Sequence, residues 1–143
     1  MRFVPAPHVL PCFTLLLLAA CTGLTAGPEV SAVTPVPATR DSAWVRAKRA
    51  LTAEVFTLDV QDSLGGRITA MRYPSASAKP GTAAACRVGL ALAIEGSGDH
   101  ADVSTTSRWL APEVTAESNP SLCEQERQET LERVLLVVAP PPN

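Results

Sequence analysis

The chain has 143 residues, of which 12 are Lys or Arg and 14 are Asp or Glu, so its formal net charge is −2. This length suffices for one domain of ordinary size. Since no basic stripe is present, the sequence argues against nucleic acid as a partner.

The first twenty residues have the layout of an export signal. Arg2 supplies a positive charge, and residues 9–20 are mostly apolar. This run is too short to cross a bilayer as a mature helix, which needs about 20 apolar residues. The run ends at Cys21, directly after two alanines.

Residues 18–21, LAAC, resemble the lipobox of bacterial lipoproteins. The resemblance implies that residues 1–20 are removed and that Cys21 carries a diacylglycerol thioether and an acyl chain such as palmitate. An ordinary cleaved signal with a chance cysteine is the alternative, and Cys12 is disfavoured by the preceding Pro11. Thr22 stands where Asp commonly retains such proteins at the inner membrane, which favours the outer membrane, facing the periplasm, in a Gram-negative organism.

Residues 21–40 are predicted to form the lipidated cysteine and a flexible tether. Prolines at 28, 35 and 37 interrupt the segment, and it shows no helical period. A flexible chain of this length has an end-to-end distance of roughly 25 Å. The folded domain is expected to span residues 41–139.

The domain is predicted to begin with a helix over 42–54, with Asp41 as N-cap. Alanines and Leu51 recur at helical spacing, and the same spacing favours a core position for Trp44. Two strands are expected next, over 56–61 and 67–73, joined by turn residues 62–66.

A second pair of strands is expected over 88–94 and 101–109, after a loop of small residues over 75–85. A turn over 96–99 joins them. The first of these strands places its large aliphatic side chains on one face, and its small residues on the other, namely Gly89, Ala91 and Ala93.

The last element is predicted to be a helix that starts at Ser121, which with Glu124 fits a capping box. Leu131, Val134 and Val138 are spaced to face inward, and Pro140 ends the helix. Residues 140–143 are expected to be a disordered tail.

These elements predict an α+β fold, a two-layer sandwich in the order α-β-β-β-β-α. Strands joined by short connections pair antiparallel, and two amphipathic helices must bury their apolar stripes on one face of the sheet. The expected sheet has four antiparallel strands.

Two cysteines remain once Cys12 is removed and Cys21 is lipidated. Cys86 and Cys123 are predicted to form a disulfide, because exported proteins fold in an oxidising compartment. Such a bridge would contribute about 4 kcal/mol by the chain-entropy estimate. Two buried free thiols are the alternative.

No constellation of residues indicates catalysis, a metal site or a cofactor. His100 is the one histidine beyond the predicted signal, and it follows a turn, where polar residues collect for backbone reasons. Two cysteines without a pair of histidines fall short of a zinc site. The predicted protein is therefore not an enzyme.

Two functions fit this sequence. The first is a non-catalytic envelope lipoprotein that docks onto another envelope protein through the small-residue face of the sheet. That face comprises Gly89, Ala91 and Ala93, with Thr69, Met71 and Tyr73 alongside; Trp109 fits either the core or this face, and we include it in the face. The second is a lipoprotein that binds a small ligand between the sheet and the helices.

Overall fold

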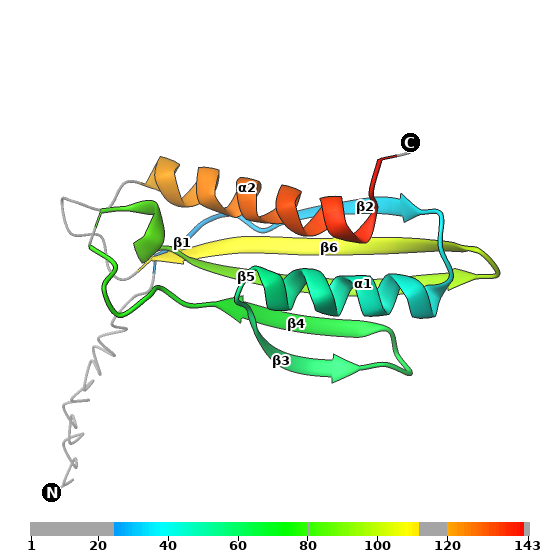
Figure 1. Cartoon of the computed structure of the whole chain (residues 1–143). Coiled ribbons are helices and arrows are strands. Elements are labelled where there is room, and N and C mark those ends of the chain that lie inside the picture. The colour runs from blue at the N-terminus through cyan, green and yellow to red at the C-terminus, as the bar shows by residue number, and fades with distance from the viewer. Residues whose placement is uncertain (1–24, 80, 112–119, 142–143) are drawn as a thin grey trace, which may run out of the picture.

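The computed structural model describes residues 25–79, 81–111 and 120–141. Helices α1 (Arg40–Ala53) and α2 (Pro120–Val138) lie on one face of a six-stranded antiparallel sheet (Figure 1). The strands and one short 3₁₀ turn are β1 (Thr25–Ala26), β2 (Val30–Val36), β3 (Thr57–Asp62), β4 (Arg67–Arg72), η1 (Ala83–Ala85), β5 (Arg87–Ser97) and β6 (His100–Ala111). The predicted α+β class, with two helices over an antiparallel sheet, is confirmed.

The expectation of four strands is wrong, because β6 pairs along both of its edges. It pairs with β5 on one side and with β1 and β2 on the other, and β4 and β3 continue the sheet beyond β5. The prediction of a flexible tether over residues 21–40 is therefore wrong for the segments that form β1 and β2. Pro35 lacks a backbone donor, but it is tolerated because β2 is an edge strand. Residues 21–24, and with them Cys21, lie outside the described part of the chain.

Helix α1 begins earlier than expected. Thr39 is its N-cap, with Oγ1 accepting a hydrogen bond from the Ser42 amide at 3.2 Å, so Asp41 lies inside the first turn. Arg40 links this helix start to the β3–β4 turn and to strand β5. Its guanidinium donates to the Ser63, Leu64 and Ile94 carbonyls at 2.9, 2.7 and 3.2 Å.

The C-terminal end of α1 is a Schellman motif without glycine. Phe56 N–H donates to the Leu51 carbonyl at 2.9 Å, and Val55 N–H donates to the Thr52 carbonyl at 3.1 Å. Val55 sits in the left-handed region, with φ of 59°, and its side chain is 78% exposed. A β-branched residue is strained in this conformation.

The core lies between the sheet and the helices. Small side chains on α1, such as Ala43 and Ala47, are fully buried and let the helix approach the sheet closely. The sheet contributes Ile68, Ala70, Val88, Leu90, Leu92, Ile94 and Val103, and α2 contributes Val134 and Val138. The prediction that Trp44 packs against the core is confirmed.

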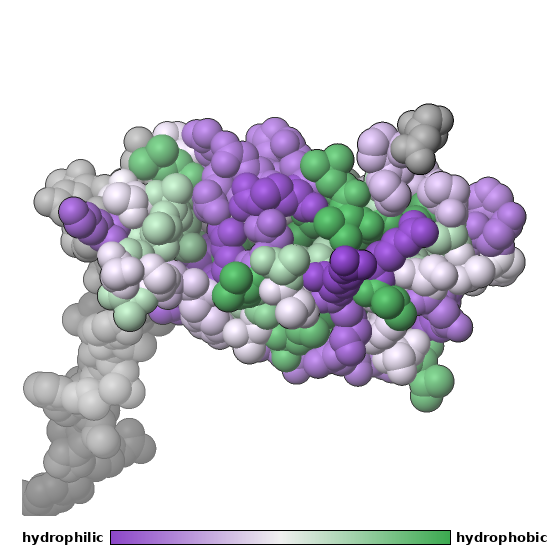
Figure 2. Space-filling model, viewed as in Figure 1, coloured by the Kyte–Doolittle hydropathy of each residue, from purple (hydrophilic) through white to green (hydrophobic). Residues whose placement is uncertain are grey.

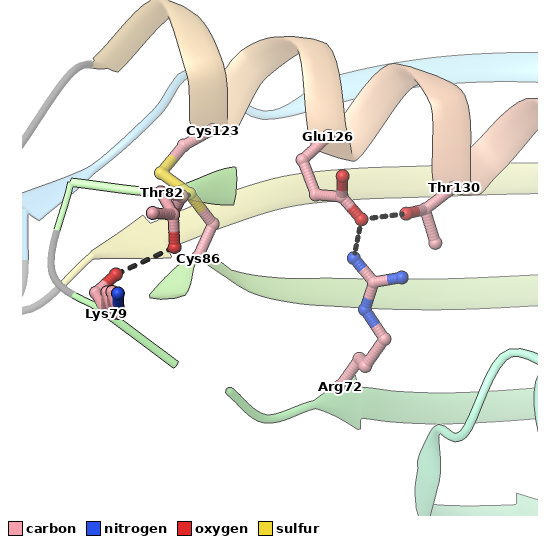
Figure 3. Close-up of a disulfide and its surroundings, with 7 residues drawn as sticks. All are labelled: Arg72, Lys79, Thr82, Cys86, Cys123, Glu126 and Thr130. Atoms are coloured by element: carbon pink, nitrogen blue, oxygen red, sulfur yellow. Dashed lines mark hydrogen bonds and ion pairs between the residues drawn. A yellow bond between two sulfur atoms is a disulfide. The ribbon is translucent and has the colours of Figure 1, made fainter. Parts of the chain in front are cut away.

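A second, smaller cluster holds the disulfide. Cys86, just before β5, is bonded to Cys123 in the first turn of α2, with a Cα–Cα distance of 5.4 Å, and the predicted bridge is thereby confirmed (Figure 3). Trp109 and Ala111 complete this cluster. The bridge therefore joins the start of β5 to the first turn of α2.

Helix α2 starts one residue before the predicted capping box. Pro120 is its first residue, which places Ser121 inside the helix instead of at the N-cap. Proline suits the first helical position because that amide has no intrahelical partner. The helix ends at Val138, and of the predicted tail Pro140 and Pro141 are exposed, whereas 142–143 lie outside the described residues.

We expect Val55→Gly to stabilise the domain by about 1 kcal/mol, because glycine adopts the left-handed conformation without a steric penalty. Urea denaturation of both proteins measures the difference. Val45→Gly is the matched control, since Val45 is exposed in the interior of α1, where glycine should destabilise by about 1 kcal/mol. Equal destabilisation by both substitutions would contradict the assignment of strain to Val55.

Candidate interaction surface

Gly89, Ala91 and Ala93 lie on the outer face of the sheet, opposite the helices. Each is half-buried, while the residues between them are buried beneath α1 and α2. Strand register places each small residue between a residue of β4 and one of β6, giving three rows, which are Met71–Gly89–Arg108, Thr69–Ala91–Thr106 and Arg67–Ala93–Ser104. We call these three rows the outer-face trough.

Two adjoining hollows follow the trough. One of about 270 Å³ is lined by Met71, Gly89 and Arg108, among others, and one of about 220 Å³ by Arg67, Ala93 and Ser104, among others. Both include the central row of Thr69, Ala91 and Thr106. The hollows exist because small floor residues are flanked by longer side chains.

Gly89 has a specific steric role in this floor. A Cβ placed on it would lie 3.3 Å from Cε of Met71, so the methionine side chain occupies the space that a larger residue would take. Glycine at this position therefore leaves room for the Met71 side chain to extend over it.

Trp109 does not belong to this face. It is 5% exposed and lies on the helix-covered side, beside the disulfide. The physical reason is strand parity, since Trp109 is in phase with Val103 and Thr105, which are also buried. Gly27 covers the indole, because a Cβ there would lie 2.0 Å from Trp109 Nε1.

Polar residues on the buried face of β6 have partners that the sequence did not reveal. Arg127 of α2 is 5% exposed, and its guanidinium donates to Ser107 Oγ at 2.8 Å and to the carboxylate of Glu124. Thr105 Oγ1 donates to the Ala32 carbonyl at 3.3 Å. Helix and sheet are thus joined by a buried arginine as well as by apolar packing.

The Arg127 hydrogen bonds lower the pKa of the Glu124 carboxyl below its usual value. Partial burial opposes this effect, while the positive charge of Arg127 and a hydrogen bond from Trp109 add to it. Glu124 is therefore ionised well into the acidic range.

A cluster of four charged residues joins α1, β4 and α2. Arg72 pairs with Glu126 and lies 3.8 Å from Glu54, while Arg133 lies 2.9 Å from Glu54 and 3.8 Å from Glu126. Thr130 donates to Glu126 at 3.3 Å (Figure 3). Each carboxylate pairs with two arginines, so these ion pairs link the end of α1, β4 and α2.

His100 lies at the tip of the β5–β6 hairpin, where its Nδ1 is 2.6 Å from the Asp99 carboxylate. Both side chains are exposed, and the hydrogen bond to His100 lowers the pKa of Asp99. The described residues contain no group of three or more His, Cys, Asp or Glu side chains placed to hold a metal ion.

A third hollow, of about 560 Å³, lies where α1 meets the ends of β3 and β4. Val55, Tyr73 and Pro74 supply apolar walls, and Glu54 and Arg72 supply charge. Elsewhere on this side of the molecule, apolar patches alternate with polar ones over the two helices (Figure 2).

Comparison with known proteins identifies the fold and no family. No family model matches the chain, and no curated protein matches it in sequence. The solved structure of Ara h 8.0201 is 5% identical, covers 80% of this chain and 96% of its own, and superposes with a TM-score of 0.55. Its likeness shows that this arrangement of sheet and helices occurs in a solved protein.

Two further solved structures superpose less well. TTHA0849 from Thermus thermophilus is 16% identical, with a TM-score of 0.45 over 78% of this chain and 94% of its own. CV1439 from Chromobacterium violaceum is 12% identical, with a TM-score of 0.41 over 79% and 98%. The function of this chain must therefore be argued from its own residues.

The lowered pKa of Glu124 makes a specific contribution to acid sensitivity. A carboxyl whose pKa is lower in the folded than in the unfolded state stabilises the fold at pH values above its unfolded-state pKa. It loses that stabilisation as the pH falls through its folded-state pKa. We therefore expect Glu124→Gln to destabilise the domain at neutral pH and this deficit to shrink at acidic pH, as measured by urea midpoints at both pH values.

Glu132→Gln is the matched control on the same helix, because among the described residues its carboxylate accepts a hydrogen bond only from Gln128. It should change the urea midpoint little at either pH. A Glu124→Gln deficit that stays constant between the two pH values would contradict the role of its ionised form.

Proposed function

We propose that this chain is a lipid-anchored protein of the bacterial cell envelope, whose domain docks onto another envelope protein through the outer-face trough. The proposal assigns the membrane contact to a lipid on Cys21 and gives the domain no catalytic role. In a Gram-negative organism the favoured location is the outer membrane, facing the periplasm. The observation that carries the docking role is a sheet face that no described helix covers.

The anchor is supported by the sequence LAAC over 18–21 and the apolar run before it. Several acyl chains hold a protein firmly at a bilayer, whereas one chain binds only marginally. None of the helices in the described residues is long and apolar enough to cross a membrane. The disulfide is consistent with export to an oxidising compartment.

The docking role is supported by the chemistry of the trough. Its floor is small and apolar, its walls carry hydroxyl groups on Thr69, Ser104 and Thr106, and Arg67 and Arg108 stand at its two ends. No carboxylate of the described residues forms an ion pair with either arginine. Glu29 and Asp59 also line the hollow beside Gly89 and Arg108, so the surface offers hydrogen bonds and charges of both signs to a protein that fits against the floor.

Binding of a small ligand is the second candidate function, but its site differs from the one that the sequence predicted. Core side chains fill the space between the sheet and the helices where the sequence placed a pocket. The hollow beside Val55 and Tyr73 is the alternative site, and its apolar walls favour an uncharged ligand. Docking is preferred because the trough extends over three strands.

We expect Cys21→Ser to abolish acylation and to release the protein from the membrane fraction. The serine hydroxyl cannot form the thioether, so no lipid is attached. Labelling of cells with radioactive palmitate, followed by fractionation, measures both effects. Cys12→Ser is the matched control and should leave labelling and fractionation unchanged. Unlabelled wild type, together with a membrane-bound Cys21→Ser variant, would refute the anchor.

We expect a photo-crosslinking residue at Ala91 to form an adduct with an envelope protein in membranes, identified by mass spectrometry. The same residue at Val45, which is exposed on α1, should form none, because the helices face away from the trough. Ala91→Glu should abolish the interaction while changing stability by less than about 0.5 kcal/mol. Adducts at Val45 and none at Ala91 would assign docking to the helical side.

A further inference from the structure

The position of β1 limits how far the domain stands from its proposed anchor. The chain is fixed from Thr25, which pairs with Ala111, and Gly27 N–H donates to the Trp109 carbonyl at 3.0 Å. Only residues 22–24 separate Cys21 from β1. Four extended steps of chain span at most about 14 Å. The end of the domain that carries β1 is therefore held close to the bilayer.

Figure 1 shows which parts of the domain share that end. η1 and the start of α2 lie beside β1, whereas the β5–β6 turn lies at the opposite end. β6 runs between the two ends, and its 12 residues extend over roughly 40 Å. A tether of about 14 Å is short compared with this length.

The outer face has an amphipathic row at the β1 end. Arg87 pairs in register with Leu110, and Leu110 pairs with Ala26. The Arg87 guanidinium lies over the ring of Tyr73, 5.6 Å from its centroid, and Tyr73 is 54% exposed. Aromatic side chains with a polar tip, and arginines with an apolar stem, are suited to the boundary between water and lipid.

Arg87 lacks the carboxylate partners that Arg72 has on the helix-covered face. It forms no ion pair with any described residue, and its Nε is buried without a hydrogen-bond partner. Arg72, one residue before Tyr73, is by contrast held by two glutamates. A guanidinium that no carboxylate neutralises is suited to binding the phosphate of a lipid headgroup through its terminal nitrogens.

The opposite end of the domain has the wrong charge for such a contact. Glu95, Asp99 and Asp102 are exposed around the β5–β6 turn. Anionic lipids repel carboxylates and attract basic side chains. Charge therefore favours the β1 end as the membrane-facing one, in agreement with the length of the tether.

We infer that the domain stands end-on at the bilayer, with Tyr73, Arg87 and Leu110 against phospholipid headgroups and the β5–β6 turn pointing away. This inference rests on the lipid anchor of the proposed function. It gives the docking partner a class, because the outer-face trough begins at Gly89 and Arg108, directly beyond this row. The partner is a protein that resides in the same membrane and exposes a surface just above the headgroups.

The test uses the lipidated full chain in vesicles of phosphatidylethanolamine and phosphatidylglycerol. A fluorophore is attached to Ser77→Cys, in the loop before η1, or to Asp99→Cys, at the opposite turn; both native residues are exposed. With a headgroup-labelled quencher lipid, we expect severalfold stronger quenching at position 77 than at position 99. Equal quenching, or stronger quenching at 99, overturns the end-on orientation.

A second pair of variants tests the row itself. Tyr73→Ser combined with Arg87→Gln should reduce quenching at position 77, whereas Arg108→Gln, one row further along the same face, should leave it unchanged. Full quenching in the double variant, with an unchanged urea midpoint, overturns the contact by this row. A wild-type chain that does not float with the vesicles refutes the anchor and thus the proposed function, which distinguishes that failure from the failure of orientation alone.

Discussion

β6 forms hydrogen bonds along both of its edges, and the positions of the other elements depend on this double pairing. β5 occupies one edge over the full length of the strand, and β1 and β2 occupy the other. Because β6 is interior to the sheet, its inward residues are covered by α2, including Trp109 and Ser107. The disulfide, the buried arginine and the entry of the chain into the domain all follow from the place of this strand.

Much of this fold could be predicted from local patterns. Helical spacing located α1 to within two residues, and alternation located the β3–β4 and β5–β6 hairpins. The count of cysteines left after the predicted signal correctly indicated the Cys86–Cys123 bridge. These features depend on neighbouring residues or on a count of residues. The face of β5 that carries the small residues Gly89 and Ala91 was also correctly distinguished from the face that carries large aliphatic side chains. This distinction needs only the alternation of side chains along one strand, which is a local property.

The remainder depends on contacts between distant residues. Residues 30–36 form a strand in the structure, yet Pro35 and the nearby prolines are typical of a tether, and only pairing with β6 makes the segment a strand. Trp109 has polar neighbours before it in the chain, and its place beneath α2 and Gly27 depends on residues far from it in sequence. Arg127 lies on a helix rich in glutamate, and its burial depends on Ser107, 20 residues earlier.

The pairing of β2 with β6 also determines where the chain can be shortened. A chain that begins at Asp41 would keep both helices and four strands, but it would expose the whole second edge of β6, with its unpaired amides and carbonyls. Open edges of this kind recruit strands from other molecules. Such a truncated protein would associate through β6 and aggregate, or accept β2 from an intact copy, so the segment from Thr25 to Val36 protects the domain from self-association.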